Sequence, residues 1–127
     1  MKLFYYDYKT LSKTLGSNDL NERNKLILLS YFLRVNTLYS IQMAGSGHVG
    51  SSLSALDIFL ASFYYKKKHK KKNLHIFSSK GHDAPSFYNV LILFGYIKFE
   101  LIHELRKKNG LPGHPDISIN QINFNTG

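Results

Sequence analysis

The chain has 127 residues, a formal net charge of +9 and no cysteine. This length suits one domain, and the lack of cysteine excludes disulfides and fits a reducing compartment. The amino terminus lacks the pattern of a signal peptide. The apolar stretch 26–33 is too short to span a bilayer and is followed by Arg34. We therefore expect a cytoplasmic protein that has no membrane partner.

Helical patterns dominate the chain from start to end. Residues 1–17 are polar and tyrosine-rich without a clear period, so we expect a poorly ordered segment, followed by one partial domain at 18–127. The expected elements are a helix from a cap at Asn18 or Asp19 to about Met43, a Gly/Ser loop at 44–50, a helix from a cap at Ser51 or Ser52 to about Tyr65, a short strand at 74–78, a helix at about 84–95 and an amphipathic helix at 99–108. This order predicts an α/β fold that is mostly helical in this segment, with one or two short strands.

Much of the positive charge lies in the run 66–72, which is lysine except at His69. One interpretation is a loop that binds a polyanion. The other is a solvated connection between a helix and a strand, because like charges repel and stay in water. No nucleic-acid motif or aromatic stacking pattern accompanies the run. We favour the solvated connection and expect no nucleic-acid partner.

Three of the expected helices are apolar on more than one face. Residues 53–65 carry one charge, at Asp57, and no charge lies between Asp83 and Lys98. Such helices normally sit inside a large protein, and a chain of this length cannot easily bury three of them. We expect either another chain to cover them or the sequence to be a piece of a larger fold.

Three Gly-His dipeptides stand out: Gly47-His48, Gly81-His82 and Gly113-His114. A glycine before a histidine lets the backbone approach a ligand while the imidazole points at it. Histidine is also the side chain best suited to moving protons near neutral pH. Three such pairs in separate loops predict a polar ligand site if the loops converge.

The surrounding residues strengthen this interpretation. They read AGSGHVGSSLSALDI from Ala44 to Ile58, SKGHDAPSFY from Ser79 to Tyr88 and LPGHPD from Leu111 to Asp116, with a closing NTG at 125–127. In this order and spacing they resemble the amino-terminal part of transketolase, a thiamine-diphosphate enzyme, and most nearly the amino-terminal subunits of split, two-chain transketolases. The resemblance runs from about Leu26 to the last residue. The chain departs from it at Leu74 and His75, where the family usually has an Asp-Arg pair.

The resemblance implies a role for several residues. His48 and His114 match catalytic histidines that face the substrate, where each would exchange a proton with a sugar hydroxyl; the alternatives are a loop histidine bonded to the backbone and a surface turn. His82 matches a histidine that binds the cofactor's diphosphate, and Lys80 either adds charge there or is solvated. Gly127 matches a glycine whose backbone lies against the cofactor. No role follows for His69, His75 and His103.

The resemblance also implies what the whole enzyme does. It would transfer a two-carbon ketol unit from a ketose phosphate to an aldose phosphate, with thiamine diphosphate and Mg²⁺ or Ca²⁺ as cofactors. The family's metal ligands and activating glutamate match no residue here, so we expect no metal ligand in this chain and no activity from it alone. The expected partners are sugar phosphates, a second copy, and the missing carboxy-terminal part or subunit. The alternatives are a related ketol transferase such as dihydroxyacetone synthase, and a non-catalytic truncated product or interaction piece.

Overall fold

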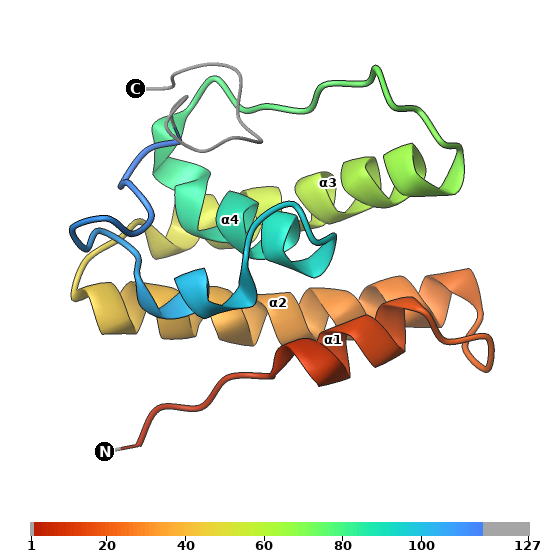
Figure 1. The fold of residues 1–127 in the computed structure, drawn as a ribbon, viewed down its shortest axis with the longest axis horizontal. Coiled ribbons are helices and arrows are strands. Elements are labelled where there is room, and N and C mark those ends of the chain that lie inside the picture. The colour runs from red at the N-terminus through yellow and green to blue at the C-terminus, as the bar shows by residue number, and fades with distance from the viewer. Residues whose placement is uncertain (1, 116–127) are drawn as a thin grey trace.

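The computed structural model describes residues 2–115, which fold into a small helical assembly (Figure 1). Its elements, in chain order, are α1 (Tyr8–Leu15), α2 (Glu22–Ala44), α3 (Val49–Lys68), the 3-10 helix η1 (Gly81–Asp83), α4 (Ala84–Leu93) and the 3-10 helix η2 (Phe99–His103). The prediction of a mostly helical segment is therefore confirmed.

Helix α4 forms the centre of the core. It packs against α2 and α3, and every one of its residues from Ala84 to Leu93 is buried. This explains why the sequence carries no charge from Ala84 to Leu93, since a charge there would have to be buried without a partner. Ring contacts of Phe87 with Phe59 and Phe63 join α4 to α3. The fold thus buries the most apolar of its helices within its own core.

The helix starts differ from those predicted. Helix α2 is capped by Asn21, whose side chain accepts a hydrogen bond from the Asn24 N–H at 2.8 Å, and not by Asn18 or Asp19. Helix α3 begins at Val49 with His48 as its N-cap, which places Ser51 and Ser52 inside its first turn. Asn21 is itself a favoured cap residue, whereas His48 starts α3 without a side-chain cap bond.

The amino-terminal segment also differs from its prediction, because it contains helix α1 and packs on α2. Asp7 caps α1 by accepting the Thr10 N–H, and Leu11 is completely buried. The Asn36 side chain makes two hydrogen bonds with the backbone of Tyr6, one to its N–H at 2.7 Å and one to its C=O at 2.9 Å. These contacts order residues predicted to be poorly ordered, whereas the boundary at 17/18 stays a prediction.

The predicted strand at 74–78 does not form within the described part of the chain. Residues 69–80, here called the arch, connect the end of α3 to the start of η1. They run back over α3 (Figure 1). A strand needs a neighbouring strand for its hydrogen bonds, and no strand is assigned among residues 2–115. The predicted strand is therefore not observed, and residues 2–115 supply no strand with which it could pair.

The predicted helix at 99–108 is also wrong beyond η2. The chain turns back after His103, and the Leu111 N–H donates to the Glu104 carbonyl at 2.9 Å while the Arg106 N–H donates to the Leu111 carbonyl at 2.7 Å. This return pairs Leu105 with Leu111 and buries both leucines. A continuous helix would have kept those two side chains apart.

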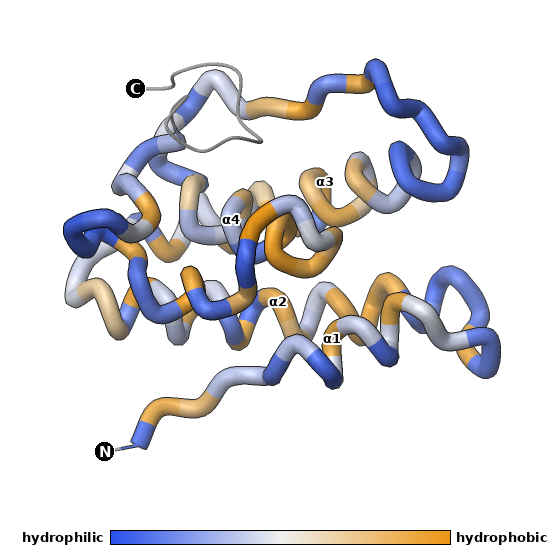
Figure 2. Tube along the Cα trace, viewed as in Figure 1, coloured by the Kyte–Doolittle hydropathy of each residue, from blue (hydrophilic) through white to orange (hydrophobic). Residues whose placement is uncertain are grey.

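Hydrophilic residues gather at the turns of this assembly. Figure 2 shows them in the turn that joins α1 to α2 and in the turn that follows α3. Within the described residues, no helix combines the length and hydrophobicity needed to cross a membrane.

Candidate functional site

The three Gly-His loops converge in the structure. The rings of His48 and His82 stack with centroids 4.1 Å apart and an angle of 29° between their planes. The ring of His114 meets that of His82 edge-on, with centroids 5.6 Å apart. His48 and His82 are exposed to solvent and His114 is half-buried. Three imidazoles from separate loops therefore form one polar surface that a ligand can reach, here called the histidine cluster.

In the loop before α3, His48 supports the start of the helix with its backbone and not with its side chain. Helix α2 ends at Ala44 and is followed by Gly45, which adopts a left-handed backbone (φ 71°) that glycine accepts without steric cost. The carbonyl of His48 then accepts the Ser52 N–H at 3.0 Å, so α3 starts on its backbone. The imidazole makes no capping bond. Its ring is left to stack on the ring of His82.

His114 reaches the cluster because Gly81 has no side chain. A Cβ on Gly81 would lie 2.6 Å from Cγ of the His114 ring, well inside van der Waals contact. The loop that carries His114 is held by Tyr88 of α4, whose hydroxyl donates to the Pro112 carbonyl at 2.6 Å. The missing side chain of Gly81 thus leaves the space that the His114 ring occupies.

His82 lies in a turn closed by a buried carboxylate. The Ser78 hydroxyl donates to Oδ2 of Asp83 at 2.8 Å and accepts the Lys80 N–H at 3.2 Å. Asp83 is 2% exposed, and its Oδ1 atom has no hydrogen-bond partner in the described part of the chain. Neither Ser78 nor Asp83 was among the predicted site residues. Their spacing across the Gly-His pair was the available signal, because short polar side chains commonly brace turns.

The start of α4 offers few free backbone N–H groups to an anion. The Ala84 N–H already donates to the Gly81 carbonyl, and Pro85 has no N–H to give. Backbone donors at a helix start are what make it an anion site. The imidazoles, with the exposed Lys80 nearby in the chain, are therefore the more evident donors for an anion here.

The remaining histidines lie outside the cluster. Nδ1 of the His103 ring is 2.7 Å from the hydroxyl of Tyr39, and burial raises the pKa of that tyrosine. His69 packs on the Tyr65 ring, and His75 lies in the arch. Gly127, the second expected cofactor residue, lies outside the described residues. No group of three His, Cys, Asp or Glu side chains that could hold a metal ion occurs among residues 2–115.

Comparisons with known proteins agree with the motif pattern. Residues 27–127 match the family model of the transketolase thiamine diphosphate binding domain. The chain is 35% identical over 92 residues to the 6-deoxy-6-sulfo-D-fructose transketolase subunit SqwG of Clostridium sp. strain MSTE9, covering 67% of this chain and 34% of that subunit. It is 32% identical over 95 residues to a subunit of the apulose-4-phosphate transketolase of Phocaeicola vulgatus, covering 68% of this chain and 34% of the relative.

Full-length transketolases match as well. Human transketolase is 33% identical over 90 residues, which are 65% of this chain and 14% of the enzyme. The chain therefore spans about a third of the length of the two subunits and a smaller share of the human enzyme. No solved structure matches. The family model covers most of the sequence, and the chain belongs to the transketolase family through its thiamine diphosphate binding domain.

Proposed function

We propose that this chain forms part of an enzyme that transfers a two-carbon ketol unit from a ketose phosphate to an aldose phosphate. The observation that carries the proposal is the convergence of His48, His82 and His114 from three loops of a thiamine diphosphate binding domain. Such a surface offers several adjacent groups that can donate, accept or move a proton. The alternative of a non-catalytic piece is not favoured, because the relatives named above are transketolases or their subunits.

The residues present fit the diphosphate of the cofactor. His82 supplies an exposed imidazole beside a braced turn, and Lys80 adds a positive charge two residues earlier. Ser52, buried in the first turn of α3, and Asp83 each carry a buried oxygen without a hydrogen-bond partner in the described part. Buried polar atoms normally have partners. The Ser52 hydroxyl can donate to a diphosphate, whereas the Asp83 oxygen accepts and would take its donor from water or further chain. When bound, thiamine diphosphate supplies the carbon nucleophile of the reaction.

His48 and His114 are proposed to act on the substrate. Both rings contact His82, so a sugar held beside the diphosphate group would lie within their reach. Each imidazole would hold or move the proton of a sugar hydroxyl as the carbon–carbon bond changes. The stack and the Gly81 contact fix the rings in advance, which lowers the cost of orienting them. We propose Gly127 as a further cofactor contact.

The described residues do not fit a metal ion, because they contain no suitable group of ligands. We propose that the Mg²⁺ or Ca²⁺ of the complete enzyme is held by other residues. We also propose that the chain works in the cytoplasm with a further polypeptide and a second copy. Two observations support a further polypeptide: two of the relatives are named as subunits, and this chain matches only about a third of their length.

An activity assay of two samples tests the proposal. The purified chain is supplied with thiamine diphosphate, Mg²⁺ and a ketose/aldose phosphate pair, alone and after completion with all the transketolase segments that it does not match, which include the rest of the amino-terminal subunit as well as the carboxy-terminal part. We expect no turnover from the chain alone and ketol transfer from the complemented sample. The proposal is wrong if the chain alone is active or if a complemented, folded sample binds the cofactor yet transfers no ketol unit to any aldose phosphate tested.

A further inference from the structure

The loop that carries His114 is bonded to the core by a buried tyrosine. Tyr88 of α4 is 1% exposed, and its hydroxyl donates to the Pro112 carbonyl at 2.6 Å. Pro112 lies two residues before His114, and its ring restricts φ to a narrow range. A shift of the Tyr88 hydroxyl would therefore reach His114 through a short and stiff stretch of chain.

The same helix also supports His82. Residues 81–83 form η1, which leads directly into α4, so Tyr88 follows His82 by six residues. The rings of His82 and His114 meet edge-on with centroids 5.6 Å apart. Helix α4 thus holds one ring of this contact at its start and the other through the Tyr88 hydroxyl.

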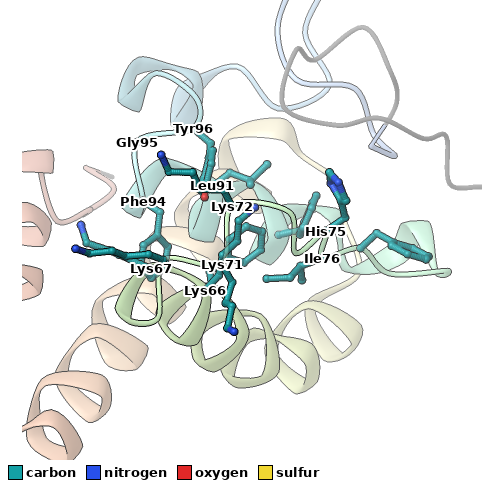
Figure 3. A pocket seen from close by; sticks show the side chains of 14 residues that line it. Lys66, Lys67, Lys71, Lys72, His75, Ile76, Leu91, Phe94, Gly95 and Tyr96 are labelled. Atoms are coloured by element: carbon teal, nitrogen blue, oxygen red, sulfur yellow. The ribbon is translucent and has the colours of Figure 1, made fainter.

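Helix α4 is a rigid support because both its sides and its far end are packed. Every residue of α4 is buried, and the helix packs against α2 and α3. Phe94 and Tyr96, which follow it, contact the Phe63 ring of α3 with centroids 6.0 and 5.7 Å apart. Figure 3 shows Phe94 and Tyr96 beside the end of α3, where the Lys66 ammonium lies 5.5 Å from the Tyr96 ring centroid. Close packing of this kind leaves Tyr88 little freedom to move.

A second side chain lies against the next residue of the loop, Gly113. A Cβ on Gly113 would lie 3.3 Å from Nε, 3.4 Å from Cζ and 3.5 Å from Nη2 of Arg106. Distances this similar place the flat face of the guanidinium over the glycine. Gly113 is not among the positive-φ glycines, so the close guanidinium, and not the backbone conformation, favours glycine there. The Arg106 N–H also donates to the Leu111 carbonyl at 2.7 Å, which ties this arginine to the same loop.

We propose that Tyr88 and Arg106 are positioning residues for His114, an inference that rests on the proposed ketol transfer. They hold Pro112 and Gly113, the two residues that come immediately before His114. Proton transfer needs the two heavy atoms about 2.6–3.2 Å apart, so a small shift of the imidazole should slow it. Neither Tyr88 nor Arg106 has to touch the substrate or the cofactor for this role.

Steady-state kinetics of the completed enzyme test the role of Tyr88. Tyr88→Phe removes only the hydroxyl and should lower kcat about tenfold, because misplacing a catalytic group by about 1 Å can cost 10²-fold. The affinity for thiamine diphosphate should stay within about twofold of the wild type, since the turn of His82 is kept. The matched control is Tyr39→Phe, which removes a buried hydroxyl bonded to His103 and should leave kcat near the wild type. Equal losses in both variants would mean general loosening of the core and would overturn the inference.

Variants of Arg106 give a second test at an exposed position, where folding is little at risk. Arg106→Gln should lower kcat about fivefold, and Arg106→Lys should lower it similarly, because lysine keeps the charge but not the flat group. Lys108→Gln makes the same charge change in the same turn, outside the contact with Gly113, and should leave kcat unchanged. Wild-type kcat in Arg106→Lys would overturn the role of the stacked guanidinium.

The position of His114 can also be measured without activity. In the full chain, NMR should show that Tyr88→Phe weakens the nuclear Overhauser effect between the rings of His82 and His114, whereas Tyr39→Phe leaves it unchanged. An unchanged effect in a folded Tyr88→Phe variant would overturn the inference.

A double variant separates this inference from the proposed function. If Tyr88 acts through His114, Tyr88→Phe should lower kcat little further in a His114→Ala enzyme, because residues that act as a unit are not additive. A full further loss of about tenfold would overturn the positioning role and leave the role of His114 intact. A wild-type rate in His114→Ala alone would instead contradict the proposed function, and this inference with it.

Discussion

The imidazole rings of His48 and His82 stack at 4.1 Å although the two residues belong to different loops, one before α3 and one in η1. Their proximity depends on the packing of α3 against η1 and α4. The arrangement of the candidate site is thus a consequence of the helical core, and each of its parts can be tested separately.

Removing either proposed substrate histidine should impair catalysis more than folding. In a completed enzyme, His48→Ala and His114→Ala should each lower kcat/KM by about 10²-fold or more, the scale of general acid–base catalysis. The thermal midpoint should change little for exposed His48. The matched control is His69→Ala, which removes an exposed histidine outside the cluster. Wild-type rates in both variants would exclude the proposed roles.

A methyl group at Gly81 should displace His114. In Gly81→Ala the new Cβ would meet the His114 ring at 2.6 Å, so the ring must move and leave its contact with His82. NMR measures this directly as a changed chemical shift of the His114 ring and a lost nuclear Overhauser effect to His82. Gly50→Ala is the control, because no atom lies within 4 Å of its Cβ position. An unchanged His82–His114 contact in Gly81→Ala would show that the glycine does not seat the ring.

The left-handed backbone of Lys70 should make glycine preferable there. Lys70→Gly is expected to stabilise the chain by about 1 kcal/mol, because glycine takes a positive φ without a Cβ penalty. Lys72→Gly removes the same charge without that relief, since Lys72 is not among the positive-φ residues, and should not stabilise. Chemical denaturation of the two variants measures the difference. Destabilisation by Lys70→Gly would argue against the observed turn.

The ion pair between Glu22 and Lys68 should make stability depend on pH and salt. The Lys68 ammonium, 2.6 Å from the carboxylate, lowers the pKa of Glu22 below its ordinary 4.5, and the carboxylate raises the pKa of Lys68 above 10.5. The Glu22 contribution is therefore complete above pH 4.5 and is lost as pH falls through the lowered pKa. The Lys68 contribution is complete below pH 10.5 and is lost as pH rises through the raised pKa.

Thermal melts of Glu22→Gln and of the wild type across a range of pH measure the contribution of that ion pair to stability. Both groups are exposed, so the difference at neutral pH should be small and should shrink in high salt. It should vanish in acid, where wild-type Glu22 is also protonated. A difference that persists in acid would mean that Glu22 acts through something other than its charge.

Sequence patterns predicted the residues of the candidate site more accurately than they predicted the details of the fold. The three Gly-His pairs and their order identified the family and the residues that converge, because those features depend on local chemistry. The closure of the His82 turn by Ser78 and Asp83 was missed although the two residues flank the Gly-His pair. The close approach of the His114 ring to Gly81 could not be predicted, since it is a contact set by packing. Helix α1 was missed because it buries only Leu11 and Thr14, and because the bonds of Asn36 to the backbone of Tyr6, just before the helix, come from a distant residue.

The predictions of the strand and of the last helix were wrong for a related reason. A strand at 74–78 needs a partner that the residues from 2 to 115 do not supply. The amphipathic pattern at 99–108 predicted one helix, yet the chain turns back after η2, pairs Leu105 with Leu111 and buries both side chains. Periodicity describes a segment alone, whereas these outcomes depend on distant residues.

Titration of thiamine diphosphate into the complemented enzyme tests the central claim most directly, which is that the histidine cluster is the cofactor and substrate site. Calorimetry in the presence of Mg²⁺ should show that His82→Ala weakens cofactor binding by about tenfold or more, because a hydrogen bond to the diphosphate is lost. His48→Ala and His69→Ala should leave the affinity near that of the wild type. Wild-type affinity in a folded His82→Ala variant would contradict the account.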